Sequence, residues 1–337
     1  IPNLQTRWSF GPILDMSRPR DGRALRTSML TMMDAPPAMG AYRALGAVAN
    51  LYNSRLGAHV RFQALPTPFD VYTDGIENPV FEEFGAGTEA LHLEDVDARR
   101  QLMGAPGYQQ MFRKQWTSKV APRAYHRNLS EARIVSAPDS SLDGRTFAEV
   151  AAQRGADPLD TFLDLQATYG NDLRWYTVIA NANPGHLQSI VSHPAAMIGF
   201  SDAGAHLRNM AFYNFPLRML KRVRDAELAG APFMSVQQAV HKLTADIADF
   251  HRIDAGRLAV GKRADVVVID PERLDDSVEE VHEQQMVGFG DLDRLVRRND
   301  DTVRAVLVNG RVAWRGGIPA ADLGTAKHYG QFLPLGG

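Results

Sequence analysis

The sequence predicts an α/β protein in which a parallel β-sheet is covered by helices and followed by a small antiparallel β unit. Stretches with helical and strand periodicity alternate through the middle of the chain, with short links between them. Near the end of the chain the Asn309-Gly310 pair joins two β-rich runs, which is the strongest short signal for a hairpin. With 45% hydrophobic residues among 337, the chain can bury a large core.

The first third of the chain predicts a helix, a strand and a long excursion. Apolar residues recur at helical spacing in residues 36–57, and a glycine ends this pattern. Apolar and polar residues alternate in 58–65, which indicates a strand. Residues 66–132 are rich in Pro, Gly, charged and aromatic residues, with helical stretches near 96–102 and 109–116. We expect this segment to be an excursion packed over a barrel mouth.

Regular alternation returns after residue 132. Thr146 and Glu149 form a predicted capping box, and Asp157 ahead of Pro158 predicts an N-cap with a proline in the first helical turn. The other expected elements are strands at 132–136, 174–180 and 196–201, a short helix at 185–191, and a helix from the Ser235–Gln238 capping box to about residue 250. Strands and helices that alternate in this way predict a parallel sheet.

The character of the chain changes after His251. A segment rich in glycine and charge, residues 256–265, leads into a β-rich run at 266–270. Residues 303–308 and 311–314 flank the predicted hairpin turn. The end of the chain is therefore expected to form a small antiparallel β unit.

Charge and composition exclude several classes of function. The chain has 37 Lys and Arg against 39 Asp and Glu, and the arginine-rich stretch 294–298 is interpreted as the solvated face of a helix. No nucleic-acid partner is therefore expected. No apolar run approaches the roughly 18 residues of a membrane span, so no membrane partner is expected either. Cysteine is absent, which excludes disulfides and thiolate zinc sites and fits a cytoplasmic location without proving it.

One segment carries the residues best suited to chemistry. In residues 197–206 an apolar strand ends in Asp202, two small residues follow, and His206 stands four positions after the acid. An acid at the carboxyl end of a barrel strand faces the active site, where it can bind a metal or take a proton from an attacking water. The pattern alone leaves a second interpretation open, in which Asp202 caps the next helix and His206 is an ordinary loop residue.

Distant segments resemble one enzyme family in the same order. The run Ser-His-Pro-x-x-Met-Ile-Gly-x-Ser-Asp at 192–202 looks like the last barrel strand of the amidohydrolase superfamily, in its D-aminoacylase or N-acyl-D-amino-acid deacylase branch. The run at 256–270 resembles that superfamily's return from barrel to β-sandwich, and the hairpin around 309–310 resembles its closing strands. This resemblance implies the C-terminal portion of a (β/α) TIM-type barrel in residues 1–252 and a small β-sandwich in 253–337.

The resemblance also implies roles for individual residues. The family's last-strand acid is a metal ligand and the general base, and the motif places both roles on Asp202. The expected cofactor is one or two divalent ions, with zinc as the expected metal. The Asp-x-x-x-His spacing resembles that of dihydroorotases, where the histidine holds a substrate carboxylate, so His206 is a candidate for substrate binding. Arg208 is a candidate for the same carboxylate, because a guanidinium forms bidentate pairs with carboxylates. A solvated loop arginine is the other interpretation of Arg208.

His186 is the candidate for a further metal ligand, because it stands at the start of a short helix close to the expected active face. The family's first barrel strand carries a His-x-His pair, whereas the ten histidines of this chain contain no such pair. The family's central bridging ligand is not recognisable either. Because few residues precede the first predicted helix, we expect a missing N-terminal segment or a second chain to complete the barrel. A mononuclear, rearranged or lost metal centre stays open, as does a homo-oligomer.

Together these features predict a metal-dependent amidohydrolase. The expected reaction is hydrolysis of a non-peptide carbon–nitrogen bond in an N-acyl-D-amino acid or a similar N-acyl compound, by a metal-activated water with Asp202 as the general base. Two alternatives stay open. One is a cyclic amidase or deaminase on the same scaffold, and the other is a catalytically inactive partner subunit that kept the barrel.

Overall fold

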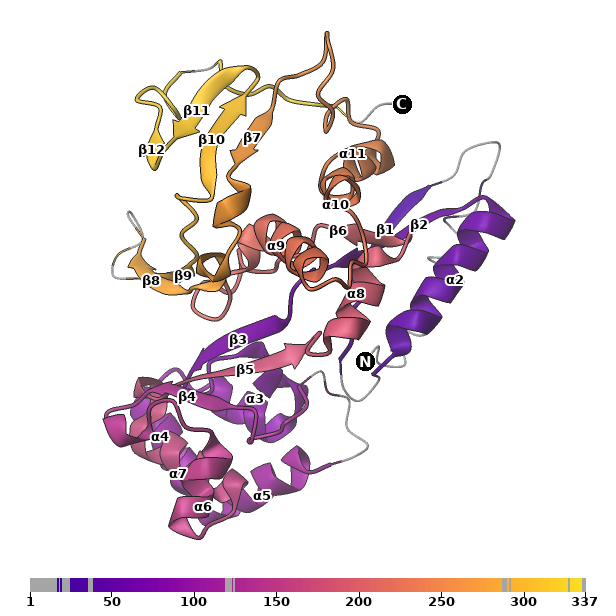
Figure 1. Ribbon diagram of the computed structural model, residues 1–337. Helices are drawn as coiled ribbons and strands as arrows, with labels where there is room; N and C mark the ends of the chain where they lie inside the picture. The colour runs from indigo at the N-terminus through magenta and orange to yellow at the C-terminus, as the bar shows by residue number, and fades with distance from the viewer. Residues whose placement is uncertain are drawn as a thin grey trace.

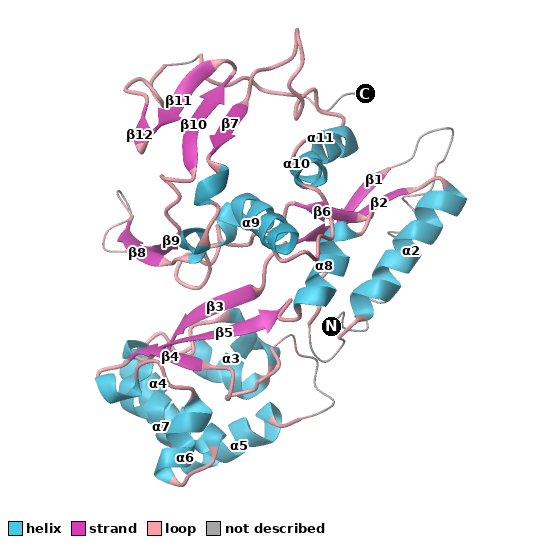
Figure 2. Ribbon diagram, viewed as in Figure 1, coloured by secondary structure: helices cyan, strands magenta, loops and turns pink. Residues whose placement is uncertain are grey.

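The structure is a computed structural model, shown in Figures 1 and 2. It describes residues 25–35, 39–118, 125–286, 292–326 and 328–334, together with Ser17, Pro19, Arg123 and Gly290. The strands are β1 (Arg26–Met29), β2 (His59–Ala64), β3 (Phe69–Asp74), β4 (Arg133–Ser136), β5 (Arg174–Ala180), β6 (Ala196–Ile198), β7 (Val266–Ile269), β8 (His282–Gln285), β9 (Asp293–Val296), β10 (Val303–Val308), β11 (Arg311–Arg315) and β12 (Ile318–Pro319). The α-helices are α2 (Ala41–Leu56), α3 (Gly85–Leu91), α4 (Val96–Gly104), α5 (Pro106–Trp116), α6 (Phe147–Arg154), α7 (Pro158–Tyr169), α8 (Pro184–Ser192), α9 (Phe215–Leu228), α10 (Val236–Leu243) and α11 (Ala245–His251).

The first sheet is parallel and has the strand order β1-β2-β6. Arg26 of β1 aligns with His59 of β2, and Phe62 of β2 aligns with Ala196 of β6. The buried and more exposed side chains alternate along β2, because successive residues of a strand point to opposite faces. A core forms between this sheet and helices α2, α8 and α9, and its buried members include Tyr42, Val60, Phe62, Leu187, Ile190 and Met219. The helix predicted at 36–57 is confirmed as α2 from Ala41 to Leu56, with residues 36–38 outside the described residues, and the strand predicted at 58–65 is confirmed as β2.

In the described residues β1 and β6 are both edge strands of this sheet, so its three strands do not close into a barrel there. The parallel sheet accounts for only part of the predicted alternation. The strands predicted at 132–136 and 174–180 are present as β4 and β5, but the prediction that they belong to the parallel sheet is wrong. They form a separate antiparallel sheet of order β3-β5-β4.

The connection between β4 and β5 explains this correction. One helix between two strands returns the chain to run parallel with the first strand. Here α6 and α7 both lie in the connection and pack on each other, so the chain reverses once more and β5 runs antiparallel to β4. Figure 1 shows the sheet with helices α3 to α7 gathered on it as one lobe.

The lobe is held together by a core of aromatic rings. Phe81 stacks on Phe162 with centroids 6.1 Å apart, and Trp175 lies edge-on to Phe81 at 6.2 Å. Trp116 stacks on Phe162 at 5.8 Å. Such ring pairs add to the stabilisation from burial. Because residues from 66–132 share this core with residues from β4, α6, α7 and β5, the lobe extends beyond the predicted excursion to the end of β5.

The C-terminal sheet has the order β12-β11-β10-β7 and is antiparallel. The predicted hairpin is confirmed: Asn309 and Gly310 have φ of 51° and 79°, as a two-residue turn of this type requires. Asp265 precedes β7 and accepts the backbone N–H of Asn309 at 2.7 Å. The acid of the family-like run at 256–270 therefore fixes the hairpin turn to the start of β7.

The prediction of a helix at the arginine-rich stretch is wrong. Asp293–Val296 is strand β9, which pairs antiparallel with β8. The strand enters the interior of the protein, because Leu295 and Val296 are both buried, whereas Arg294 before them is partly exposed. Arg297, just after the strand, is also buried, which a solvated helix face would not allow.

The predicted helix starts are confirmed. Thr146 and Glu149 form a reciprocal capping box, and so do Ser235 and Gln238. The helix expected to run from Ser235 to about residue 250 is broken at Thr244, whose φ of −131° and ψ of −88° separate α10 from α11. Within the described segments, every helix is too short or too polar to cross a bilayer.

Candidate functional site

The carboxyl edge of the parallel sheet forms a hollow of about 480 Å³. Leu30 and Thr31 line it just after β1, and Gln63 lines it near the end of β2. Residues 199–202, after β6, complete the lining. Side chains at the carboxyl ends of parallel strands meet at one edge, which is where α/β proteins place their ligands. The position therefore makes this hollow the candidate active site.

Asp202 stands at the rim of this hollow, four residues beyond the end of β6. Its φ of 52° lies in the left-handed region that few residues other than glycine adopt, although aspartate tolerates it better than most. The side chain is 43% exposed, and its Oδ2 lies 3.9 Å from Nε2 of His206. The structure thus brings together the residue predicted as general base and one residue predicted to bind substrate.

Arg208 lies in the same loop, but its guanidinium is already paired. Its Nε donates to Oδ2 of Asp74 at 2.9 Å, and its Nη1 donates to Oε2 of Glu283 at 3.1 Å. Burial lowers the pKa of Arg208, but the two carboxylates outweigh burial and raise it. Arg174 contacts the same two acids and donates to the backbone carbonyl of Arg208 at 3.2 Å. Two arginines and two acids therefore form a closed quartet, so a substrate carboxylate must compete for Arg208.

His186 lies in the first turn of α8 and contacts an acid that follows β1. Its Nδ1 is 2.7 Å from Oδ2 of Asp34, whose side chain is 1% exposed. The backbone N–H of Asp34 donates to the side-chain oxygen of Asn181. The backbone carbonyl of Asp34 accepts the N–H of Asn181. Histidines that bind metals are commonly oriented in this way, with one nitrogen bonded to a carboxylate and the other left for the ion.

The described residues offer only scattered donors for a metal ion. No group of three or more His, Asp or Glu side chains gathers closely enough in the described segments to hold a metal ion. Asp202 and His186, the two predicted ligands, therefore do not form a metal centre with other described residues. This part of the chain does not by itself fit the expected ion.

A second, larger hollow of about 780 Å³ lies at the opposite, amino edge of the parallel sheet. Arg61 pairs with Asp246 at 2.8 Å, and Arg26 donates to backbone carbonyls near the end of α11. The pKa of His59 is lowered by burial and by neighbouring cations, Arg26 first among them. The charged groups here join α11 to the sheet, and the amino edge of a barrel is a place of structural rather than catalytic residues.

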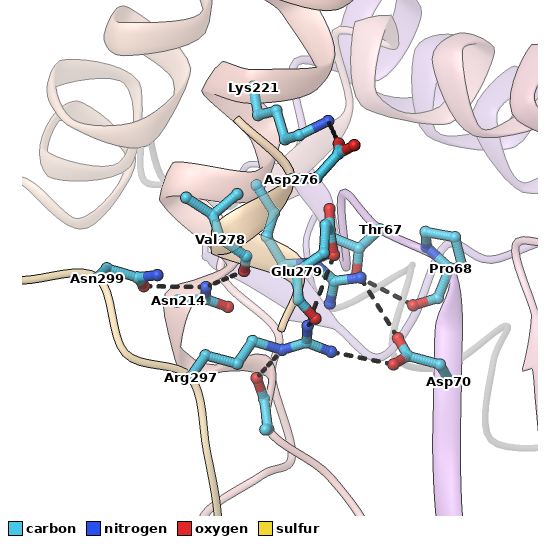
Figure 3. A network of polar contacts seen from close by, with 12 residues as sticks. Thr67, Pro68, Asp70, Asn214, Lys221, Asp276, Val278, Glu279, Arg297 and Asn299 are labelled. Atoms are coloured by element: carbon cyan, nitrogen blue, oxygen red, sulfur yellow. Dashed lines mark hydrogen bonds and ion pairs between the residues drawn. The ribbon is translucent and has the colours of Figure 1, made fainter. Parts of the chain in front are cut away.

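A buried ionic cluster joins the lobe to the C-terminal part of the chain (Figure 3). Asp70 of β3 accepts from Nη2 of Arg297 at 3.0 Å and from Nη2 of Arg218 at 3.4 Å. Glu279 contacts both arginines. The side chains of Asp70, Arg218 and Arg297 are 8%, 4% and 2% exposed. Charges this deeply buried occur in proteins only when they are paired.

The ionic cluster also includes and adjoins groups whose pKa is shifted. Burial lowers the pKa of Arg297, as does the neighbouring Arg218, while Asp70 and Glu279 act in the opposite direction. Burial and the charge of Asp70 raise the pKa of Tyr72. None of the cluster's members belongs to a recognisable functional motif of the sequence. Its one signal is the arginine-rich stretch, and nothing in that stretch identifies an acid 227 residues away.

Comparisons with known proteins show that the chain is similar to members of one protein family. The sequence model of the family described as "Amidohydrolase family" matches residues 85–313. An uncharacterized protein of Mycobacterium tuberculosis is 48% identical over 297 residues, which cover 88% of this chain and 49% of the relative. The N-acyl-D-glutamate deacylase of Alcaligenes xylosoxydans xylosoxydans is 32% identical over 155 residues, which cover 44% of this chain and 29% of that relative. The chain thus spans about half the length, or less, of these relatives.

One solved structure has a similar fold. The N-acyl-D-glutamate deacylase from Bordetella bronchiseptica, crystallised with zinc and a phosphonate inhibitor, matches 97% of this chain and 53% of its own. The TM-score is 0.51 and the sequence identity is 21%. At this identity the likeness is evidence of the fold alone.

Proposed function

Because the chain belongs to the amidohydrolase family, we propose that it forms part of a hydrolase acting on a carbon–nitrogen bond other than a peptide bond. The proposed substrate is an N-acyl-D-amino acid or a similar N-acyl compound, which the name of the Alcaligenes relative supports. The three parallel strands would then belong to a (β/α) barrel and the C-terminal strands to its β-sandwich.

One observation carries the proposal: Asp202 lies at the rim of a hollow at the carboxyl edge of the parallel strands. Hydrolysis of an unactivated amide needs a base within hydrogen-bond reach of the attacking water. Asp202 is exposed enough to reach a bound water and has His206 beside it. We assign it the role of general base, which takes the proton from the water and returns it to the departing nitrogen.

We further propose a divalent metal ion, for which zinc is the expected element. When bound, such an ion would supply a Lewis acid, which polarises an amide carbonyl and lowers the pKa of bound water. Asp202 is the residue of this chain that we propose as a ligand of the ion. Because the described residues do not complete a ligand set, the other ligands are expected in a further segment or a second chain.

His206 and Arg208 are proposed to hold an acidic group of the substrate. Because Arg208 is already paired with Asp74 and Glu283, a substrate carboxylate must displace one of these two acids. Glu283 is the more exposed of the two acids in the quartet, 42% against 15% for Asp74, so it is the one a substrate carboxylate can replace. An acidic N-acyl compound would then bind where Glu283 now pairs.

A product assay tests the proposed function. Purified protein is incubated with N-acetyl-D-glutamate, N-acetyl-D-leucine and a cyclic amide such as dihydrouracil, and the release of a primary amine or a ring-opened acid is measured. Release of the free D-amino acid, which stops when the metal is chelated, is the expected result. Hydrolysis of the cyclic amide alone would replace the proposal with a cyclic amidase. Absence of every product from a protein that contains no metal would favour an inactive partner subunit.

A further inference from the structure

The loop that carries Asp202 is tied down beyond His206 by consecutive residues bonded to distant strands. The carbonyl of Leu207 accepts the N–H of Leu295 in β9 at 2.8 Å. Arg208 joins the quartet with Asp74 and Glu283 described above. The backbone carbonyl of Asn209 accepts the N–H of Tyr72 in β3 at 2.9 Å. The loop therefore lies between β3 of the lobe and the β8–β9 hairpin, and it is bonded to both.

Asn209 is bonded to β3 and to the turn after it through both its side chain and its backbone. Its side-chain Nδ2 donates to the carbonyl of Tyr72 at 2.8 Å and to the carbonyl of Glu77 at 2.9 Å. With its own carbonyl it thus makes three bonds to β3 and to the turn after it, and the residue is 8% exposed. In the other direction its N–H donates to the carbonyl of His206 at 3.0 Å.

Backbone hydrogen bonds connect Asn209 to the turns that carry Asp202 and His206, the candidate catalytic pair. The His206 carbonyl also accepts the N–H of Met210, so residues 206–210 form one closed turn. The preceding turn is closed by the N–H of Ala205, which donates to the carbonyl of Asp202 at 3.3 Å. Two consecutive turns therefore lead from the anchored Asn209 back to Asp202. At Asp202 the backbone is in the left-handed region, a conformation that persists only where surrounding contacts hold it.

We infer that Asn209 is a positioning residue, which holds the turns carrying His206 and Asp202 in place by binding the backbone of β3 and its following turn. Its effect on the loop follows from the contacts alone. Its effect on catalysis rests on the proposed function, because a displaced base lowers the rate even when the substrate still binds.

A matched control is available in Asn214. Its Nδ2 also makes two bonds, to the carbonyl of Val278 at 2.9 Å and to Oδ1 of Asn299 at 3.0 Å, and the residue is 7% exposed. It lies at the start of α9, beyond the anchored loop. Asn209→Ala and Asn214→Ala therefore remove similar bonds at similar burial, and only the first should loosen the loop.

Hydrogen–deuterium exchange of the full chain tests the inference without an activity assay. The amides of Tyr72, Ala205 and Met210 should exchange about tenfold faster or more in Asn209→Ala, since the loss of two hydrogen bonds favours local opening of the loop. Asn209→Asp, which keeps the shape but lacks the two N–H donors, should behave like Asn209→Ala. Asn214→Ala should leave these amides unchanged. Unchanged exchange in both Asn209 variants, or equal acceleration in Asn214→Ala, would overturn the inference.

Kinetics provide the second readout. If the protein hydrolyses an N-acyl-D-amino acid, Asn209→Ala should lower kcat about tenfold to a hundredfold and move KM much less. Asn214→Ala with an equal loss of thermal stability should keep wild-type kcat, and an equal fall in both variants would overturn the catalytic part of the inference. If the wild-type protein hydrolyses none of the substrates, the proposed function fails and the exchange result alone decides whether Asn209 positions the loop.

Discussion

Nη2 of Arg297 donates to Oδ2 of Asp70 at 3.0 Å in the interior of the protein, and the two residues are 227 positions apart. Arg297 follows β9 and Asp70 belongs to β3, so the pair connects the lobe to the C-terminal strands. Removing one partner of a buried ion pair strongly destabilises the folded protein, because the other charge stays desolvated and unpaired.

Asp70→Ala should therefore lower the free energy of unfolding by about 3–5 kcal/mol, the usual range for breaking a buried pair. Urea unfolding followed by tryptophan fluorescence measures this change. The exposed pair of Asp97 and Arg100 provides the control, with side chains 83% and 40% exposed. Asp97→Ala should cost about 1 kcal/mol or less. Equal losses in the two variants would contradict the assignment of Asp70 to a buried cluster.

Glu283→Gln tests whether the quartet limits the binding of an acidic substrate. The amide keeps the size of the side chain but removes the charge that competes for Arg208. The KM for N-acetyl-D-glutamate should fall about twofold to fivefold, as expected for losing one exposed ion pair of up to about 1 kcal/mol. The KM for N-acetyl-D-leucine should fall as well if Arg208 binds the α-carboxylate, which both compounds have. An unchanged or higher KM for both compounds would contradict a carboxylate role for Arg208.

The hairpin turn should contribute stability that depends on pH. The pKa of Asp265 is lowered mainly by the backbone N–H of Asn309, with burial acting against it and Arg263 supporting it. A carboxyl group with a lowered pKa in the folded state stabilises the protein above its unfolded pKa, about 4, and loses this contribution as pH falls through the folded value. The difference in unfolding free energy between wild type and Asp265→Asn should thus be largest near neutral pH.

Urea unfolding at pH 7, 5 and 3 measures this dependence. The stability difference between the two proteins should hold from pH 7 to 5 and shrink at pH 3. A difference that does not change with pH would show that the charge of Asp265 has no part in fixing the turn.

Local patterns in the sequence predicted the elements well where one short segment contains all the information. The capping boxes at Thr146 and Ser235 each depend on residues three positions apart, and both are present. The turn at Asn309-Gly310 needs only its own backbone conformation. These features could be predicted because no distant residue decides them.

Pairing between distant strands could not be predicted in the same way. The periodicity of β5 is the same whether its neighbours run parallel or antiparallel, and the two-helix connection of α6 and α7 decides between these possibilities. Likewise, Arg297 gives no sign of its partner until β9 and β3 are brought together. Asp202 could be selected because a resemblance marked it, whereas Asn209 belongs to no recognisable pattern.

The catalytic assignment depends on Asp202, and the turnover of Asp202→Asn tests it most directly. The substitution keeps the shape of the side chain and removes its basicity, so kcat on the wild-type protein's best N-acyl-D-amino acid should fall about 10²–10⁴-fold. Asp254→Asn is the control, since Asp254 is 73% exposed and paired with Lys262, and it should keep wild-type kcat. Wild-type turnover in a folded Asp202→Asn protein would contradict the account, because no base at this position would then be needed.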